Sequence, residues 1–162
     1  MTIYLMQGAP GSGKSTWIER NAPEACVVSA DHYFYRPNWY SPNREYHFDP
    51  SKLGVAHASC MRKFIRAIEL DGETLIVVDN TSPRVSDLSP YYAVAKALSE
   101  EPIVVVRVLC DPAVAAARNV HGVPAHAVER ITAAMENPPP FWDCQLEVVN
   151  NNPASRKAAR IY

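Results

Sequence analysis

An eight-residue stretch near the amino terminus has the residue types and the spacing of a phosphate-binding loop. It reads GAPGSGKS from residue 8 to residue 15, after an apolar run typical of a strand and before a segment typical of a helix. In such a loop the glycines let backbone amides point at phosphate oxygens, the lysine neutralises the outer phosphates, and the serine hydroxyl can bind magnesium. We therefore expect binding of ATP and Mg²⁺, with Ser15 as a metal ligand. The expected nucleotide contacts are Gly8, Pro10, Gly11, Ser12, Gly13, Lys14, Ser15 and Thr16.

Asp31 is the candidate base for transfer of a phosphoryl group. Such transfer commonly needs a carboxylate that takes the proton of the acceptor hydroxyl. The run 25–29 predicts a short buried strand, so Asp31 would stand at its carboxyl end and bind the acceptor. The alternative is that its carboxylate only caps backbone amides of a turn.

Asp79 ends another apolar run, and Asn80 follows it. A carboxylate in this place of a phosphate-loop protein holds magnesium directly or through water, so we expect Asp79 to be a metal ligand. ATPases of the motor type usually carry a glutamate next, which activates water. Asn80 instead favours transfer to an acceptor, and we expect it to contact that acceptor. The alternative for Asp79 is a cap at the end of the strand.

The segment 33–50 is rich in aromatic and basic residues and is the expected substrate loop. Interleaved rings and cations suit base stacking with phosphate contacts. The alternative, nearly as well supported, is a long loop held down by its own aromatic side chains. The residues expected to contact the acceptor here are Tyr35, Arg36 and Arg44.

A short lid is predicted over residues 118–124, between two helices. A mobile lid could place Arg118 on the transferring phosphate, which makes Arg118 a candidate catalytic and nucleotide-binding residue beside Lys14. His121 is a candidate substrate contact, and a hinge or helix cap is an equal alternative. The basic tail 154–162 could help hold a strand, but short terminal charge clusters are more often solvated.

Alternating strand and helix patterns must position these residues. Continuous β-branched runs predict parallel strands covered on both faces, and amphipathic segments such as 51–71 predict the crossover helices. A further helix is expected near residues 89–99. The order predicts an α/β fold with a five-stranded, doubly wound parallel sheet and helices on both faces. The carboxyl ends of its strands should converge on the phosphate loop. The stretch 150–153 after the last strand is where we expect the adenine pocket. The predicted strands are 3–6, 25–29, 74–79, 103–106 and 146–149.

Composition narrows the class of protein. With 162 residues, 48% of them hydrophobic, the chain suits one domain over residues 1–162. The formal net charge of −1 gives no global field for binding a long duplex, so contacts with nucleic acid would be local. No apolar run approaches a membrane span, and we expect a cytoplasmic protein with no membrane contact. The sequence indicates no particular protein partner.

Taken together, five stretches resemble the 5′-kinase domain of phage-type polynucleotide kinases. They resemble still more closely the kinase module of some animal ubiquitin-ligase-binding proteins. The likeness spans nearly the whole chain and implies a P-loop kinase fold. The stretches are 8–16, 29–34, 46–50, 78–81 and 118–124.

The resemblance implies ATP-dependent transfer of the γ-phosphate to a 5′-hydroxyl end of DNA or RNA, as in nucleic acid repair. It implies ATP and Mg²⁺ binding by Lys14 and Ser15, a base at Asp31 and phosphate contacts by Arg118. The phage kinases carry a second lid arginine where this chain offers only His121. Two other interpretations stay open: a kinase of a small molecule or of a hydroxymethylated base in DNA, and a nucleotide-gated module without catalysis.

Overall fold

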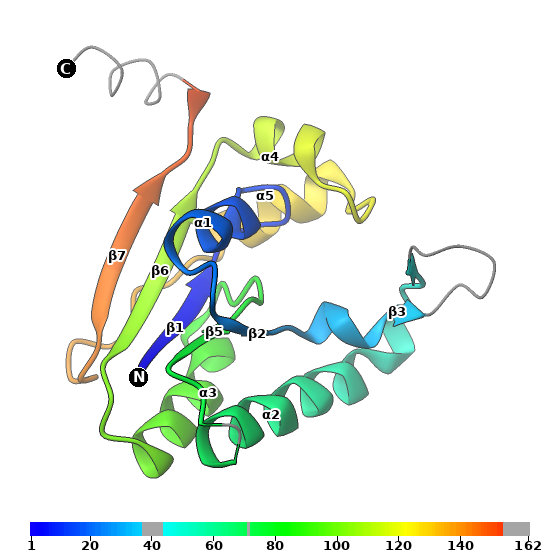
Figure 1. Ribbon diagram of the computed structural model, residues 1–162. Coiled ribbons are helices and arrows are strands. Elements are labelled where there is room, and N and C mark those ends of the chain that lie inside the picture. Colours follow the sequence, from blue (N-terminus) through cyan, green and yellow to red (C-terminus); the bar gives the residue numbers. More distant parts are fainter. Residues whose placement is uncertain (37–43, 71, 154–162) are drawn as a thin grey trace.

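Five parallel strands form one sheet in the computed structural model, which describes residues 1–36, 44–70 and 72–153 (Figure 1). Their order across the sheet is β2-β5-β1-β6-β7. Strand β1 lies in the middle, between strands reached by crossovers in opposite directions, which is where open α/β sheets bind ligands. The expected doubly wound parallel sheet is confirmed. The strands are β1 (Thr2–Gln7), β2 (Cys26–Val28), β5 (Leu75–Val78), β6 (Ile103–Leu109) and β7 (Gln145–Asn150).

Helices cover both faces of the sheet, as the sequence predicts. Helix α1 packs on one face, α2 and α3 pack on the other, and α4 and α5 form a pair beside the loop that follows β1 (Figure 1). The helices are α1 (Lys14–Asn21), α2 (Leu53–Glu69), α3 (Val85–Leu98), α4 (Pro112–Arg118) and α5 (Ala125–Ala133).

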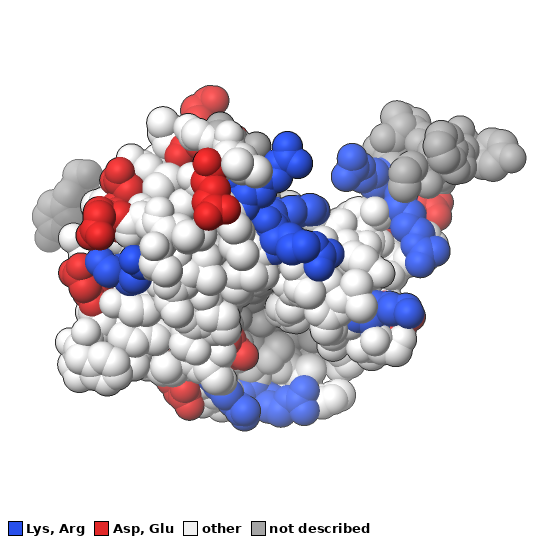
Figure 2. All heavy atoms as spheres, turned by 90° about the horizontal axis from the view of Figure 1, so that it is seen from below, with Lys and Arg blue, Asp and Glu red and all other residues white. Residues whose placement is uncertain are grey.

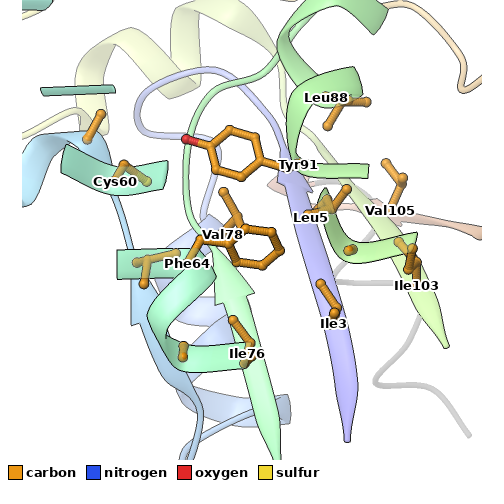
Figure 3. Close-up of a cluster of buried hydrophobic side chains, with 14 of the residues drawn as sticks. Ile3, Leu5, Cys60, Phe64, Ile76, Val78, Leu88, Tyr91, Ile103 and Val105 are labelled. Atoms are coloured by element: carbon orange, nitrogen blue, oxygen red, sulfur yellow. The ribbon is translucent and has the colours of Figure 1, made fainter. Parts of the chain in front are cut away.

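Side chains of β1 alternate between the two halves of the core. Leu5 points to the side of α2 and α3, where the rings of Phe64 and Tyr91 lie over the sheet (Figure 3). Met6 points to the other side and packs with Trp17 of α1. This alternation is the reason that a continuous apolar run is needed for a strand buried on both faces.

Two helices begin elsewhere than their patterns predict. Helix α3 starts at Val85, ahead of the expected start near residue 89, because Asp87 Oδ2 accepts a hydrogen bond from Arg84 N at 2.9 Å and caps its first turn. Pro90 is the sixth residue of α3 and lacks the N–H that would continue the helical hydrogen bonds at that position. Helix α2 starts at Leu53, after a 3₁₀ turn over Pro50–Lys52, and not at residue 51.

Part of the segment 33–50 forms a small hairpin where the sequence predicts a loop. Strand β3 (Tyr35–Arg36) pairs with the antiparallel strand β4 (Glu45–Tyr46), which places Tyr35 opposite Tyr46. The hairpin stands apart from the main sheet (Figure 1). The part of the predicted substrate loop from 37 to 43 and the basic tail 154–162 lie outside the described residues. Of the helices described, none has the length and apolar character needed to span a membrane.

Candidate functional site

The loop from Gly8 to Ser15 joins β1 to α1 at the carboxyl edge of the sheet. Gly11 and Gly13 have φ angles of 78° and 105°, which favour glycine. A Cβ at Gly11 would collide with the carbonyl oxygen of Ala115 in α4, and one at Gly13 would collide with the Asn151 side chain. Both glycines are therefore required by the close approach of neighbouring segments as well as by the backbone conformation.

Lys14 folds back over this loop. Its Nζ donates hydrogen bonds to the carbonyl oxygens of Gly8, at 2.9 Å, and Ala9, at 3.3 Å. Burial lowers the pKa of Lys14, and the negative charges of Asp79 and Asp31 oppose that shift. The two carboxylates predicted from separate strands thus act on the same ammonium group.

Two polar atoms at this edge are buried without a hydrogen-bond partner among the described residues. They are Asp79 Oδ1 and Ser12 Oγ. Burial raises the pKa of Asp79, and the charge of Lys14 partly offsets this. An oxygen that is buried and unsatisfied in the folded chain is a group with bonding capacity left for a ligand. Ser15, the second residue of α1, is exposed.

Asp31 lies in a 3₁₀ turn over Ala30–Tyr33 directly after β2. Ser29 caps this turn, because its Oγ accepts a hydrogen bond from Asp31 N at 3.2 Å. The hydroxyl of Tyr46 in the hairpin donates a hydrogen bond to Asp31 Oδ1 at 3.0 Å. The capping role considered for the Asp31 carboxylate is therefore filled by Ser29.

Asn80 ties the end of β5 to its neighbours. Its Oδ1 accepts from Ala30 N at 3.0 Å, and its Nδ2 donates to Tyr91 Oη at 3.2 Å. Nδ2 also lies 3.7 Å from Cys60 Sγ. The side chain holds the start of the Asp31 turn in place, and its role as an acceptor contact stays a prediction.

The predicted lid reaches the hairpin. Arg118 is the exposed last residue of α4. Asn119 braces the loop after it, since its side chain bonds the backbone of Ala116 and both the N–H and the carbonyl of Val123. The His121 ring then lies 4.4 Å, between centroids, from the ring of Tyr46.

The described aromatic side chains of the hairpin region pack on one another. The rings of Phe34 and Phe48 are 5.1 Å apart, and Tyr46 lies 5.1 Å from Tyr35 and is stacked at 6.4 Å on Phe48. Phe48 is nevertheless 51% exposed. The described part of the segment is therefore held together by its own aromatic side chains, and base stacking on the exposed rings stays a prediction. Arg36 and Arg44 are exposed at its margin.

A cavity of about 540 Å³ opens beside Asn80, between α2, α3 and α5. Met61, Tyr91 and Ile131 contribute apolar lining, and Arg84 and Arg130 contribute positive charge. Figure 2 looks onto the molecule from the side of α2 and α3 and shows a hollow with Lys and Arg side chains on its margins.

Asn151 is a site residue whose role sequence reasoning missed. The stretch 150–153 is predicted to border the adenine, and the structure uses its buried Asn151 to hold the phosphate loop, since Nδ2 donates to Ser12 O at 2.6 Å. A cavity of about 360 Å³ lies beside it, with Thr16, Trp17 and Val149 in its lining. Only proximity to the last strand could have pointed to Asn151.

The comparisons with known proteins agree with this architecture. The family model AAA_33, described as an AAA domain, matches residues 3–138. The chain is 30% identical over 169 residues to NEDD4-binding protein 2 of Homo sapiens. That alignment covers 99% of this chain, which spans only 9% of the length of the relative.

Two solved structures share the fold. A sugar kinase from Janibacter sp. HTCC2649 has a TM-score of 0.57 and 18% identity, over 98% of this chain and 90% of that one. Kti12 of Chaetomium thermophilum, solved with ADP-AlF3, has a TM-score of 0.56 and 18% identity, over 91% of this chain and 88% of that one. The chain therefore belongs to the AAA domain family AAA_33 and is a P-loop kinase-like domain.

Proposed function

We propose that the chain is an ATP-dependent polynucleotide kinase that transfers the γ-phosphate of ATP to a 5′-hydroxyl end of DNA or RNA. One observation carries the proposal: the negative charges of Asp31 and Asp79 both act on the pKa of Lys14 in the phosphate loop, so the two carboxylates are within electrostatic reach of its ammonium group. A nucleotide-gated module needs no carboxylate positioned for an acceptor hydroxyl.

In the proposed reaction the acceptor oxygen attacks the γ-phosphorus and its proton passes to the Asp31 carboxylate. The bond from the γ-phosphorus to the bridging oxygen breaks, and ADP leaves. Lys14 and the loop amides bind the phosphates, and Arg118 would place its guanidinium on the transferring group as the lid closes.

The residues present fit a magnesium ion. Asp79 Oδ1 is buried without a partner in the described part of the chain, and Ser15 is an exposed residue in the first turn of α1. Hard oxygen donors of this kind are what Mg²⁺ prefers. When bound, the ion would neutralise phosphate charge. Asp79 and Ser15 would hold it.

The cavity between α2, α3 and α5 supports a polynucleotide acceptor. The cavity next to Asn80 combines apolar lining with Arg84 and Arg130, which suits a nucleoside joined to phosphates. Figure 2 shows an open hollow on this side of the molecule, with both basic and acidic side chains on its margin, whereas a metabolite kinase needs a closed pocket. Tyr35, Arg36, Arg44 and His121 would contact the acceptor at the hairpin and the lid.

The test offers γ-labelled ATP with 5′-hydroxyl DNA, with 5′-hydroxyl RNA and with a panel of sugars, nucleosides and hydroxymethylated DNA. We expect label on an oligonucleotide end, none with Lys14→Ala, and a higher KM for the oligonucleotide in Arg130→Gln with the KM for ATP unchanged. Label on metabolites or modified bases alone would identify the rival kinases. ATP binding without transfer to any acceptor would identify the non-catalytic module.

A further inference from the structure

Tyr46 is the one residue that joins the hairpin, the lid and the proposed base among the contacts of the described residues. Its hydroxyl donates to Asp31 Oδ1 at 3.0 Å, and its ring lies 4.4 Å from the ring of His121. The contact with Asp31 spans 15 residues of sequence and depends on the pairing of β3 with β4.

The hydroxyl of Tyr46 stays protonated and can donate its hydrogen bond throughout the neutral pH range. Burial raises its pKa, and the charge of Asp31 and the hydrogen bond to Asp31 raise it further, so the phenol keeps its proton at neutral pH. A proton that is always present can fix the carboxylate in one orientation. The bond occupies Oδ1, and a carboxylate has a second oxygen with which to take a proton.

The Tyr46 ring is itself held in place. It packs against Phe34 at 6.0 Å, Tyr35 at 5.1 Å and Phe48 at 6.4 Å. Its hydroxyl is therefore presented to Asp31 by a packed aromatic cluster rather than by a free side chain. A change of lid position that moves His121 would press on this same ring.

We propose that Tyr46 is the positioning residue for the Asp31 carboxylate and links the lid to it. The inference rests on the proposed function for its kinetic consequences, but the hydrogen bond itself exists in the free protein. Charged groups near Asp31 in the described part of the chain include Lys14 of α1, Asp79 after β5 and the neighbouring His32, on which Arg44 next to β4 also acts. Among the described hairpin residues, Tyr46 is the one whose side chain donates a hydrogen bond to the carboxylate.

The kinetic test replaces only the donor. Tyr46→Phe keeps the ring and its packing and removes the hydroxyl. Loss of a hydrogen bond to a charged acceptor lowers a rate constant that depends on it by about tenfold to a hundredfold. We therefore expect kcat to fall by that factor and the KM for ATP to stay unchanged. Tyr92→Phe is the matched control, because it also removes a tyrosine hydroxyl that makes a hydrogen bond, from Asp143 N at 2.8 Å, at a residue with no proposed role in the site, and it should keep kcat within about twofold. Equal kcat in Tyr46→Phe and the wild-type protein would overturn the proposal.

A spectroscopic test needs no turnover. The Cζ chemical shift of Tyr46, assigned by the loss of its resonance in Tyr46→Phe, is compared at neutral pH in the wild-type protein and in Asp31→Asn. We expect this chemical shift to change in Asp31→Asn, because the charged acceptor of the hydroxyl hydrogen bond is gone, and to stay unchanged in Asp49→Asn. An unchanged Tyr46 chemical shift in Asp31→Asn refutes the link even if transfer is observed, and a changed one upholds the link even if no acceptor is phosphorylated.

Discussion

Gln7, the last residue of β1, is fully buried and should be a major source of stability. Its Nε2 donates to Pro83 O at 3.1 Å and to Glu136 O at 3.0 Å, and its Oε1 accepts from Arg107 Nε at 2.7 Å. Its exposed fraction is 0%. These bonds join the sheet to the loop after β5 and to the segment after α5, directly behind the phosphate loop. Gln7→Leu would keep a similar volume and remove all of them.

The structure sets the size of the loss. Pro83 O keeps a bond from Glu136 N, and Glu136 O keeps one from Arg107 Nη2, so neither carbonyl is left alone. The hydrogen bond from the charged Arg107 Nε contributes most, at about 1.5–3 kcal/mol, and each neutral bond adds about 0.5–1.5 kcal/mol. Because both carbonyl oxygens keep another hydrogen bond, the sum of the three contributions lies in the lower half of its range, and we expect the free energy of unfolding to fall by about 3 kcal/mol. For a chain of this length that corresponds to a fall in Tm of about 6–12 °C.

Thermal and urea unfolding measure this loss. Gln145→Leu is the control, because Gln145 is exposed on the edge strand β7 and should change the free energy of unfolding by less than about 0.5 kcal/mol. A Tm for Gln7→Leu within a degree or so of the wild-type value would refute the reasoning. So would an equal fall in both variants.

Two further predictions concern the phosphate loop. Asn151→Ala removes the bond to Ser12 O, and we expect the Kd for ATP, measured by calorimetry, to rise about tenfold; an unchanged Kd would contradict this. Burial raises the pKa of Asp79, so the folded chain binds the proton of this carboxyl group more tightly than the unfolded chain does. The contribution of this proton to the free energy of unfolding is therefore fully present below about pH 4, and it is lost as the pH rises through the folded-state pKa. Asp79→Asn should therefore lose less stability than the wild-type protein between about pH 4 and pH 7 in urea unfolding, and an unaltered pH slope would contradict the assignment.

The sequence predicts the sheet and the residues at strand ends because both follow from local patterns. Apolar runs fix the strands, and parallel strands bring their carboxyl ends to one edge, so Asp31 and Asp79 could be placed near Lys14 without coordinates. In the structure the charges of both carboxylates act on the pKa of Lys14, and their roles in catalysis and metal binding stay predictions.

The rest of the site depends on contacts between distant segments. Tyr46 reaches Asp31 because of the register between β3 and β4, two strands of two residues each. No periodic pattern in the sequence predicts this register. Gln7 and Asn151 act on backbone atoms more than a hundred residues away. Polar side chains of this kind carry no spacing signal, because their partners are carbonyl groups that every residue has.

The most direct test of the proposed function measures transfer from γ-labelled ATP to a 5′-hydroxyl oligonucleotide with Asp31→Asn beside the wild-type protein. Asp49→Asn is the control, because Asp49 is an exposed carboxylate that caps the turn at Ser51. The proposal predicts that Asp31→Asn binds ATP as the wild-type protein does and loses transfer by about a hundredfold or more, while Asp49→Asn transfers normally. Full transfer by a folded Asp31→Asn protein would contradict the role of this carboxylate as the base.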